Sequence, residues 1–239
     1  MRLRLATANI WGLPAPLSWP PRRVRFPRVR RFIEGELDVV LLQEHWRLPA
    51  RPRVLDNLCL IAPARHEGDS GLALRTHHRV IERRHGSFQA GAASVLDKMW
   101  SRKGWQRVAL DVSGTRIDVI NTHLEAYTPA RHALVRARQI DELLVIAAAT
   151  SGPVVLAGDF NFYAGIAADR QSQGRIEAAG FVDVVASFDT TPTYDRRGER
   201  ERFDRVFVRG LDCTAARVDV NAGLADHRPV IVELQPLPR

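Results

Sequence analysis

Short apolar runs recur along the chain and predict β-strands. The first alternates apolar and polar positions over residues 3–9, a near-continuous apolar run follows at residues 38–42, and another short buried run lies at residues 154–157. Alternation is typical of a strand with one wetter face, whereas a continuous run indicates a strand covered on both faces. Further strands are predicted at residues 108–112, 116–124, 205–208 and 229–234, of which the first two form a hairpin through Ser113 and Gly114.

Three segments between these runs predict helices. The clearest has Thr128 as its N-terminal cap and Pro129 in its first turn, and it ends before residues 151–153, Ser-Gly-Pro. Its apolar side chains recur every three or four residues, which places on one face Ala133, Ala137, Ile140, Leu144 and Ala147. Shorter helices are predicted over residues 27–36 and 169–179, the second closed by Gly180. Hairpins mixed with helical connections favour an α/β fold with mixed sheets and helices packed outside.

Length and composition indicate one globular domain over residues 1–239. Hydrophobic residues make up 45% of the chain, but the longest apolar stretches are about 8 residues, whereas a membrane span needs roughly 20. No apolar leader follows Met1, so we expect a cytoplasmic protein, and we expect it to be a monomer. Cys59 and Cys213 lack metal-ligand spacing and are interpreted as buried thiols.

The net charge of +8 changes the expected partners, because a basic surface attracts polyanions such as nucleic acid or anionic lipid. The alternative is that an arginine-rich composition reflects genome base content. A dense basic run could bind phosphate or form a solvated helix face; it comprises Arg22, Arg23, Arg25, Arg28, Arg30 and Arg31. A second run, residues 196–202, is of mixed sign and is interpreted as an exposed loop, which could reach a substrate phosphate because it is close to Asp204.

Polar residues cluster where the predicted strands begin and end. Strands end at Asn9, Glu44, His123, and at Asp159 with Asn161, whereas Asp204 and the pair Asp226–His227 precede other strands. If the last two strands run antiparallel to the others, all these side chains meet at one rim of the sheets, where α/β proteins place their sites. Each residue alone could be a turn or solvated residue, but a chance rim would not collect so many acids and amides.

Carboxylate oxygens such as those of Glu44 and Asp159 are ligands that suit Mg²⁺ or Mn²⁺. A metal of this kind polarises a phosphoryl oxygen and lowers the pKa of bound water. A histidine beside an aspartate can serve as general base or acid, and amides can donate to phosphate oxygens. The rim therefore predicts metal-dependent hydrolysis of a phosphate ester.

The same residues resemble the endonuclease/exonuclease/phosphatase superfamily, which includes deoxyribonuclease I and neutral sphingomyelinases. Six segments match its motifs in order: residues 7–12, 41–44, 121–124, 157–161, 202–207 and 226–230. The resemblance implies a four-layer α/β sandwich, with two mixed β-sheets face to face and helices outside. One departure is Arg205, which stands where the family often has tyrosine after Asp204.

The resemblance also implies roles for the rim residues. Glu44 is expected to be the main metal ligand with Asn9 beside it, and Asp226 to lie in a second metal region. Asp159 would orient or deprotonate the attacking water, and Asn161 would contact the phosphate. His227, oriented by Asp204, would be the catalytic base or transition-state stabiliser. His123 would stabilise or protonate the leaving group.

The substrate stays open at this stage. The motifs at residues 11–14, 44–46 and 122–126 resemble those of sphingomyelinase-like members more than those of nucleases. Trp100 and Trp105 flank a basic turn that could enter a lipid interface or simply pack on the sheet edge. Three hypotheses remain: a phosphodiesterase acting on a phospholipid or another small diester, a nuclease, and a non-catalytic polyanion-binding protein. Retention of the acids and histidines argues against the third.

Overall fold

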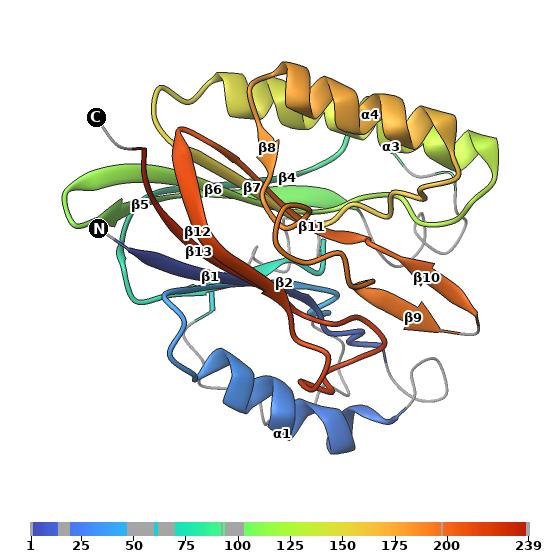
Figure 1. The fold of residues 1–239 in the computed structure, drawn as a ribbon, viewed down its shortest axis with the longest axis horizontal. Helices are drawn as coiled ribbons and strands as arrows, with labels where there is room; N and C mark the ends of the chain where they lie inside the picture. The colour runs from blue at the N-terminus through green and yellow to red at the C-terminus, as the bar shows by residue number, and fades with distance from the viewer. Residues whose placement is uncertain are drawn as a thin grey trace.

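The computed structural model describes residues 2–13, 20–46, 60–61, 70–91, 93, 103–196 and 198–237. Two β-sheets lie face to face with helices on their outer sides (Figure 1). The first has the order β12-β13-β1-β2-β3, formed by Leu211–Val218, Val230–Pro236, Leu3–Asn9, Val39–Gln43 and Ala73–Thr76. The second has the order β4-β5-β6-β7-β11-β8, formed by Arg79–Ser87, Gly104–Val112, Thr115–His123, Val154–Asp159, Asp204–Arg209 and Val182–Asp183.

Three helices and one hairpin complete the described elements. Helix α1 (Arg22–Ile33) covers the first sheet, and helices α3 (Ala130–Ala148) and α4 (Ala167–Ala178) cover the second (Figure 1). Strands β9 (Tyr194–Arg196) and β10 (Glu199–Glu201) form a separate two-stranded sheet, and Tyr194 also makes an isolated antiparallel bridge to His227. The run at residues 196–202, interpreted from sequence as an exposed loop, therefore belongs largely to this hairpin.

Three apolar clusters separate the layers. The central cluster joins side chains from both sheets, such as Leu41 of β2 and Val119 of β6. A second cluster packs α1 on the first sheet, and a third packs the other helices on the second sheet through residues such as Ile140 and Ile176. Three apolar interfaces separate four layers, helix, sheet, sheet and helix, which confirms the expected α/β sandwich.

Both sheets are mixed, as predicted. Strands β1 and β2 pair in parallel, and so do β6 and β7, whereas β13 runs antiparallel to β1 and β11 antiparallel to β7. The strands that end in polar residues therefore run in the opposite direction to the strands that begin with them. As a result, both sets of polar residues lie at the same rim of the sheets.

Two helix starts differ from the predicted ones. Helix α1 begins at Arg22 and contains Pro27, which was predicted to open it. Pro27 and Arg23, whose carbonyl loses its helical partner, are both exposed, so water can satisfy that carbonyl. Helix α3 begins at Ala130 with Pro129 at the cap position, so Thr128 lies outside it, and Leu143 rather than Leu144 is fully buried.

The expectation for the cysteines holds only in part. Cys213 is half-buried rather than buried, and burial raises the pKa of its thiol. Cys59 lies outside the described residues. Within the residues that the structure covers, none of the helices has both the length and the apolar character that a membrane crossing would require.

Candidate active site

Strand register brings the predicted rim residues to one place. Asn9 pairs with Gln43, which places Glu44 one residue beyond the end of the parallel partner strand. In the other sheet Asp159 lies between two neighbours, opposite His123 on the parallel strand β6 and opposite Asp204 on the antiparallel strand β11. Asp159 is therefore the centre of the group.

Asn9 links the two sheets at this rim. Its amide nitrogen donates to Glu44 Oε1 at 3.1 Å and to Asp159 Oδ2 at 2.9 Å, while its Oδ1 accepts from the backbone N–H of Trp11 at 2.9 Å. Burial raises the pKa of Glu44, against the opposing effect of the Lys103 charge and the Asn9 hydrogen bond. Asn9 thus holds two carboxylates of separate sheets within one hydrogen-bonding unit.

A close backbone approach fixes Glu44. The N–H of Gly12 donates to the carbonyl oxygen of Glu44 at 3.0 Å, and a Cβ added to Gly12 would lie 2.0 Å from that oxygen. Glu44 itself has a φ of 56°, which costs free energy in a non-glycine residue. Only glycine at position 12 permits this approach, and strain of this kind clusters at functional sites.

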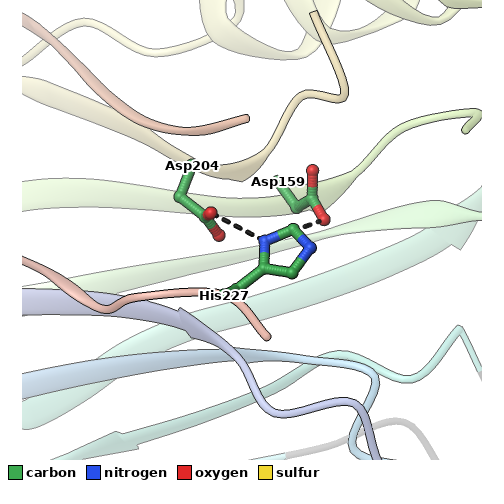
Figure 2. Close-up of side chains that lie close together, drawn as sticks. All are labelled: Asp159, Asp204 and His227. Atoms are coloured by element: carbon green, nitrogen blue, oxygen red, sulfur yellow. Dashed lines mark hydrogen bonds and ion pairs between the residues drawn. The ribbon is translucent and has the colours of Figure 1, made fainter. Parts of the chain in front are cut away.

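His227 lies between two buried carboxylates (Figure 2). Its Nδ1 is 2.8 Å from Asp204 Oδ2 and 3.8 Å from Asp159 Oδ2. Burial alone would lower the pKa of His227, but the charges of Asp204 and Asp159 raise it to about 10, and burial raises the pKa of Asp204. At neutral pH the pair therefore holds a proton between Nδ1 and Oδ2, which leaves Nε2 of His227 as the ring nitrogen for chemistry.

Asn161 and His123 flank Asp159 on its other sides. The backbone N–H of Asn161 donates to Asp159 Oδ1 at 3.0 Å, and its side-chain amide donates to the Leu124 carbonyl at 3.1 Å. His123 Nε2 lies 3.4 Å from Asp159 Oδ2. Burial would raise the pKa of Asp159, but the neighbouring His123 and His227, the Asn9 hydrogen bond and Lys103 outweigh it and lower the pKa. Asp159 is therefore ionised at neutral pH.

Asp226 stands apart from this group. Its Oδ2 accepts from Arg196 Nη1 at 3.2 Å, and Arg196 also stacks on Trp11, with its guanidinium carbon 4.4 Å from the ring centroid. The sequence placed Arg196 in a loop that could reach a substrate phosphate, but it did not predict these contacts with Asp226 and Trp11. The hairpin β9–β10 thus contacts the segments that carry both Asn9 and His227.

Lys103 is a second residue that sequence reasoning missed. The sequence placed it in a basic turn that could enter a lipid interface or pack on the sheet edge, but it is 6% exposed and its Nζ lies 2.7 Å from His123 Nε2. The predicted strand began only at residue 108, whereas β5 begins at Gly104, which directly follows Lys103 and pairs with His123. Trp105 of that strand is half-buried against Gly86, and Trp100 lies outside the described residues.

The basic residues of α1 were expected either to bind phosphate or to form a solvated helix face, and neither expectation holds for all of them. Arg25 is buried and donates to four backbone carbonyls, those of Ile10, Trp11, Pro20 and Leu224. It therefore fixes the turn after β1 rather than binding phosphate or facing water. Arg23, Arg28 and Arg31 are exposed.

The donor chemistry of the rim fits a divalent cation at Glu44. Possible ligand atoms of Asp159, Asp204 and His227 lie within 4.8 Å of one another. The His227 atom that faces the two carboxylates is Nδ1, which is already hydrogen-bonded to Asp204. We therefore interpret this trio as a hydrogen-bonded unit rather than as the metal site. The Glu44 side chain keeps an oxygen beyond the one that Asn9 occupies and is only partly buried. A hard carboxylate oxygen at the edge of the site is what Mg²⁺ or Mn²⁺ prefers.

Three solved structures share this fold. They are sphingomyelinase C from Streptomyces griseocarneus (22% identity, TM-score 0.65), D. rerio TDP2 complexed with a single-strand DNA product (18%, 0.74), and a Staphylococcus aureus beta toxin mutant with bound magnesium ions (17%, 0.72). The alignments cover 98%, 98% and 97% of this chain, respectively, and 99% of each of the others.

The sequence comparisons complete the assignment. No curated protein sequence matches this chain significantly. The Endonuclease/Exonuclease/phosphatase family matches residues 6–227, which span every rim residue described above. The chain therefore belongs to the endonuclease/exonuclease/phosphatase family, whose named activities are all hydrolyses of phosphate esters.

Proposed function

We propose that this protein hydrolyses a phosphodiester with the rim residues as its active site and Mg²⁺ or Mn²⁺ as its cofactor. The observation that carries the proposal is the hydrogen-bonded chain from Glu44 through Asn9 to Asp159, with His227 and His123 beside it. Side chains from both sheets converge there, although Asn9 and Asp159 are 150 residues apart in sequence.

Each residue has a role that its contacts support. Glu44 would hold the cation, with Asn9 as the second ligand through the remaining lone pair of Oδ1. The bound cation would polarise a phosphoryl oxygen and favour ionised water. Asp159, ionised and tied to Asn161, would orient the attacking water and accept its proton.

His227 would stabilise charge on the phosphoryl group through Nε2, because Asp204 keeps its Nδ1 protonated and its ring fixed. His123 would act on the leaving-group side, and Asn161 would contact the phosphate. Asp226 would lie in a second metal region only after releasing Arg196.

For the substrate we propose a phospholipid of the sphingomyelin kind or another small diester. The similarity of the motifs at residues 11–14 and 122–126 to those of sphingomyelinases supports this, as does the sphingomyelinase C structure among those that share the fold. A nuclease is the second candidate, supported by a neighbour that holds single-strand DNA and by the exposed arginines of α1. Measuring turnover of sphingomyelin, plasmid DNA and bis(p-nitrophenyl) phosphate with Mg²⁺ separates these two candidates. Activity on DNA alone would reject the phospholipid substrate.

We expect Glu44→Gln to weaken binding of the metal ion specifically. The amide keeps an oxygen for the Asn9 hydrogen bond but removes the negative charge that the cation needs. The Mg²⁺ concentration for half-maximal hydrolysis of bis(p-nitrophenyl) phosphate should rise more than about tenfold. Glu34→Gln, which alters an exposed acid beyond the end of α1, is the matched control. An unaltered Mg²⁺ titration in Glu44→Gln would count against Glu44 as a ligand.

A further inference from the structure

Lys103 is a buried cation with an unusual partner. Its ammonium lies 2.7 Å from Nε2 of His123, and among the described residues no carboxylate forms an ion pair with it. An ammonium carries three donors and no acceptor. Two of its N–H groups therefore have no acceptor within the described part of the chain, although leaving buried donors without acceptors costs free energy.

The contact also fixes the state of His123. Because an ammonium can only donate, Nε2 of His123 accepts from Lys103, and the proton of the neutral ring lies on Nδ1. In this arrangement Nε2 has no proton to offer to a leaving group or to Asp159, which is 3.4 Å away. The donor on this side of the site is Lys103.

The charge of Lys103 reaches the centre of the site. It opposes the effect of burial on the pKa of Glu44 and also lowers that of Asp159, so it lies close to both carboxylates without hydrogen-bonding to either. A phosphodiester is an anion that gains negative charge as water attacks, in a site already lined by the buried acids Asp159 and Asp204 and the partly buried Glu44. A cation placed before the reaction offsets that charge at no cost of reorganisation.

The residue type supports the same conclusion. Only two of the 35 basic residues in the chain are lysines, Lys98 and Lys103, so arginine is the ordinary cation of this protein. At the one described lysine the cation is buried beside the site. Lysine presents a compact point charge with three rotatable donors, so it can bind a phosphoryl oxygen without the fixed fork geometry of a guanidinium.

We propose that Lys103 is a further catalytic residue of this site, which donates hydrogen bonds to a non-bridging oxygen of the bound phosphate ester and is positioned by His123. The inference rests on the proposed phosphoesterase function. It makes Lys103, rather than His123, the hydrogen-bond donor to the phosphate on this side of the site and makes His123 a positioning residue. Inorganic phosphate, the simplest anion with the same oxygens, is the probe for it.

The first test does not depend on turnover. In protein labelled with ¹³C at lysine Cε, two lysine signals are expected, and the one missing from Lys103→Met belongs to Lys103. Titration with inorganic phosphate and Mg²⁺ should shift that signal saturably, and His123→Ala should move the response to higher phosphate concentration. A Lys103 signal indifferent to phosphate would overturn the proposal even if the enzyme proves active. A saturable shift would support it even if no diester tried is cleaved.

The second test uses the reaction. Lys103→Met should lower kcat/KM for bis(p-nitrophenyl) phosphate about 10²–10³-fold, as expected for loss of one preorganised donor, and raise the inhibition constant of inorganic phosphate at least tenfold. Its melting temperature should not fall, since the change removes a buried charge. Arg84→Met on the exposed strand β4 removes the same charge and should change neither constant. A phosphate inhibition constant within twofold of wild type in Lys103→Met would refute the role.

Discussion

Replacing His227 with alanine is expected to lower kcat roughly 10²–10³-fold, the range for loss of one preorganised donor to the transition state, while the protein stays folded. The fold should survive because Asp204, whose pKa burial already raises, can remain as the neutral acid after its partner is removed. Steady-state rates with Mg²⁺ and bis(p-nitrophenyl) phosphate measure the loss, and circular dichroism melting checks the fold. Unchanged kinetics in a folded variant would refute the role.

Asp204 provides the matched test of the pair. Asp204→Asn keeps the size of the side chain but removes the charge that holds Nδ1 of His227 protonated. The single change should also lower kcat, and adding it to His227→Ala should cost little more, because residues that act as one unit give non-additive losses. Losses that multiply in the double variant would show that the two residues act independently.

The rim could be predicted from sequence because strand pairing obeys simple rules. Apolar runs fixed the strands, and parallel or antiparallel pairing then determined which ends meet, so Asn9, Glu44 and Asp159 converge as expected. The polar edge strand β4 could not be predicted, because most of its residues are exposed and no buried face imposes an alternating pattern.

The missed site residues share a physical cause. Lys103 and Arg196 lie in runs of charged residues, where composition predicts solvated surface. Their actual environments depend on partners distant in the chain, His123 for the first and Asp226 with Trp11 for the second. A local pattern carries no signal for such contacts, whereas a strand end does, since its neighbours follow from pairing.

For the same reason, the sequence pattern did not predict a buried ionic network that lies next to the segments following the site strands. Arg136 of α3 makes two hydrogen bonds to Asp169 of α4, at 2.9 and 2.8 Å, and both side chains are fully buried. It also donates to the carbonyls of Glu125 and Tyr127, in the segment that follows His123. Asp169 in turn accepts from the backbone N–H of Tyr163, after β7. One ion pair therefore ties together the segments that follow two site strands.

Arg136→Met should destabilise the protein by about 3–5 kcal/mol, because it leaves the Asp169 carboxylate buried without its partner. For a chain of this size that corresponds to a fall in melting temperature of roughly 6–20 °C. Arg30→Met is the matched control, since it breaks a partly exposed pair with Glu34 and should cost under about 1 kcal/mol. In Arg136→Met with Asp169→Asn, much of the loss should return, because no unpaired charge remains. A double variant no more stable than Arg136→Met would show that the lost hydrogen bonds to Glu125 and Tyr127, rather than the charge, account for the destabilisation.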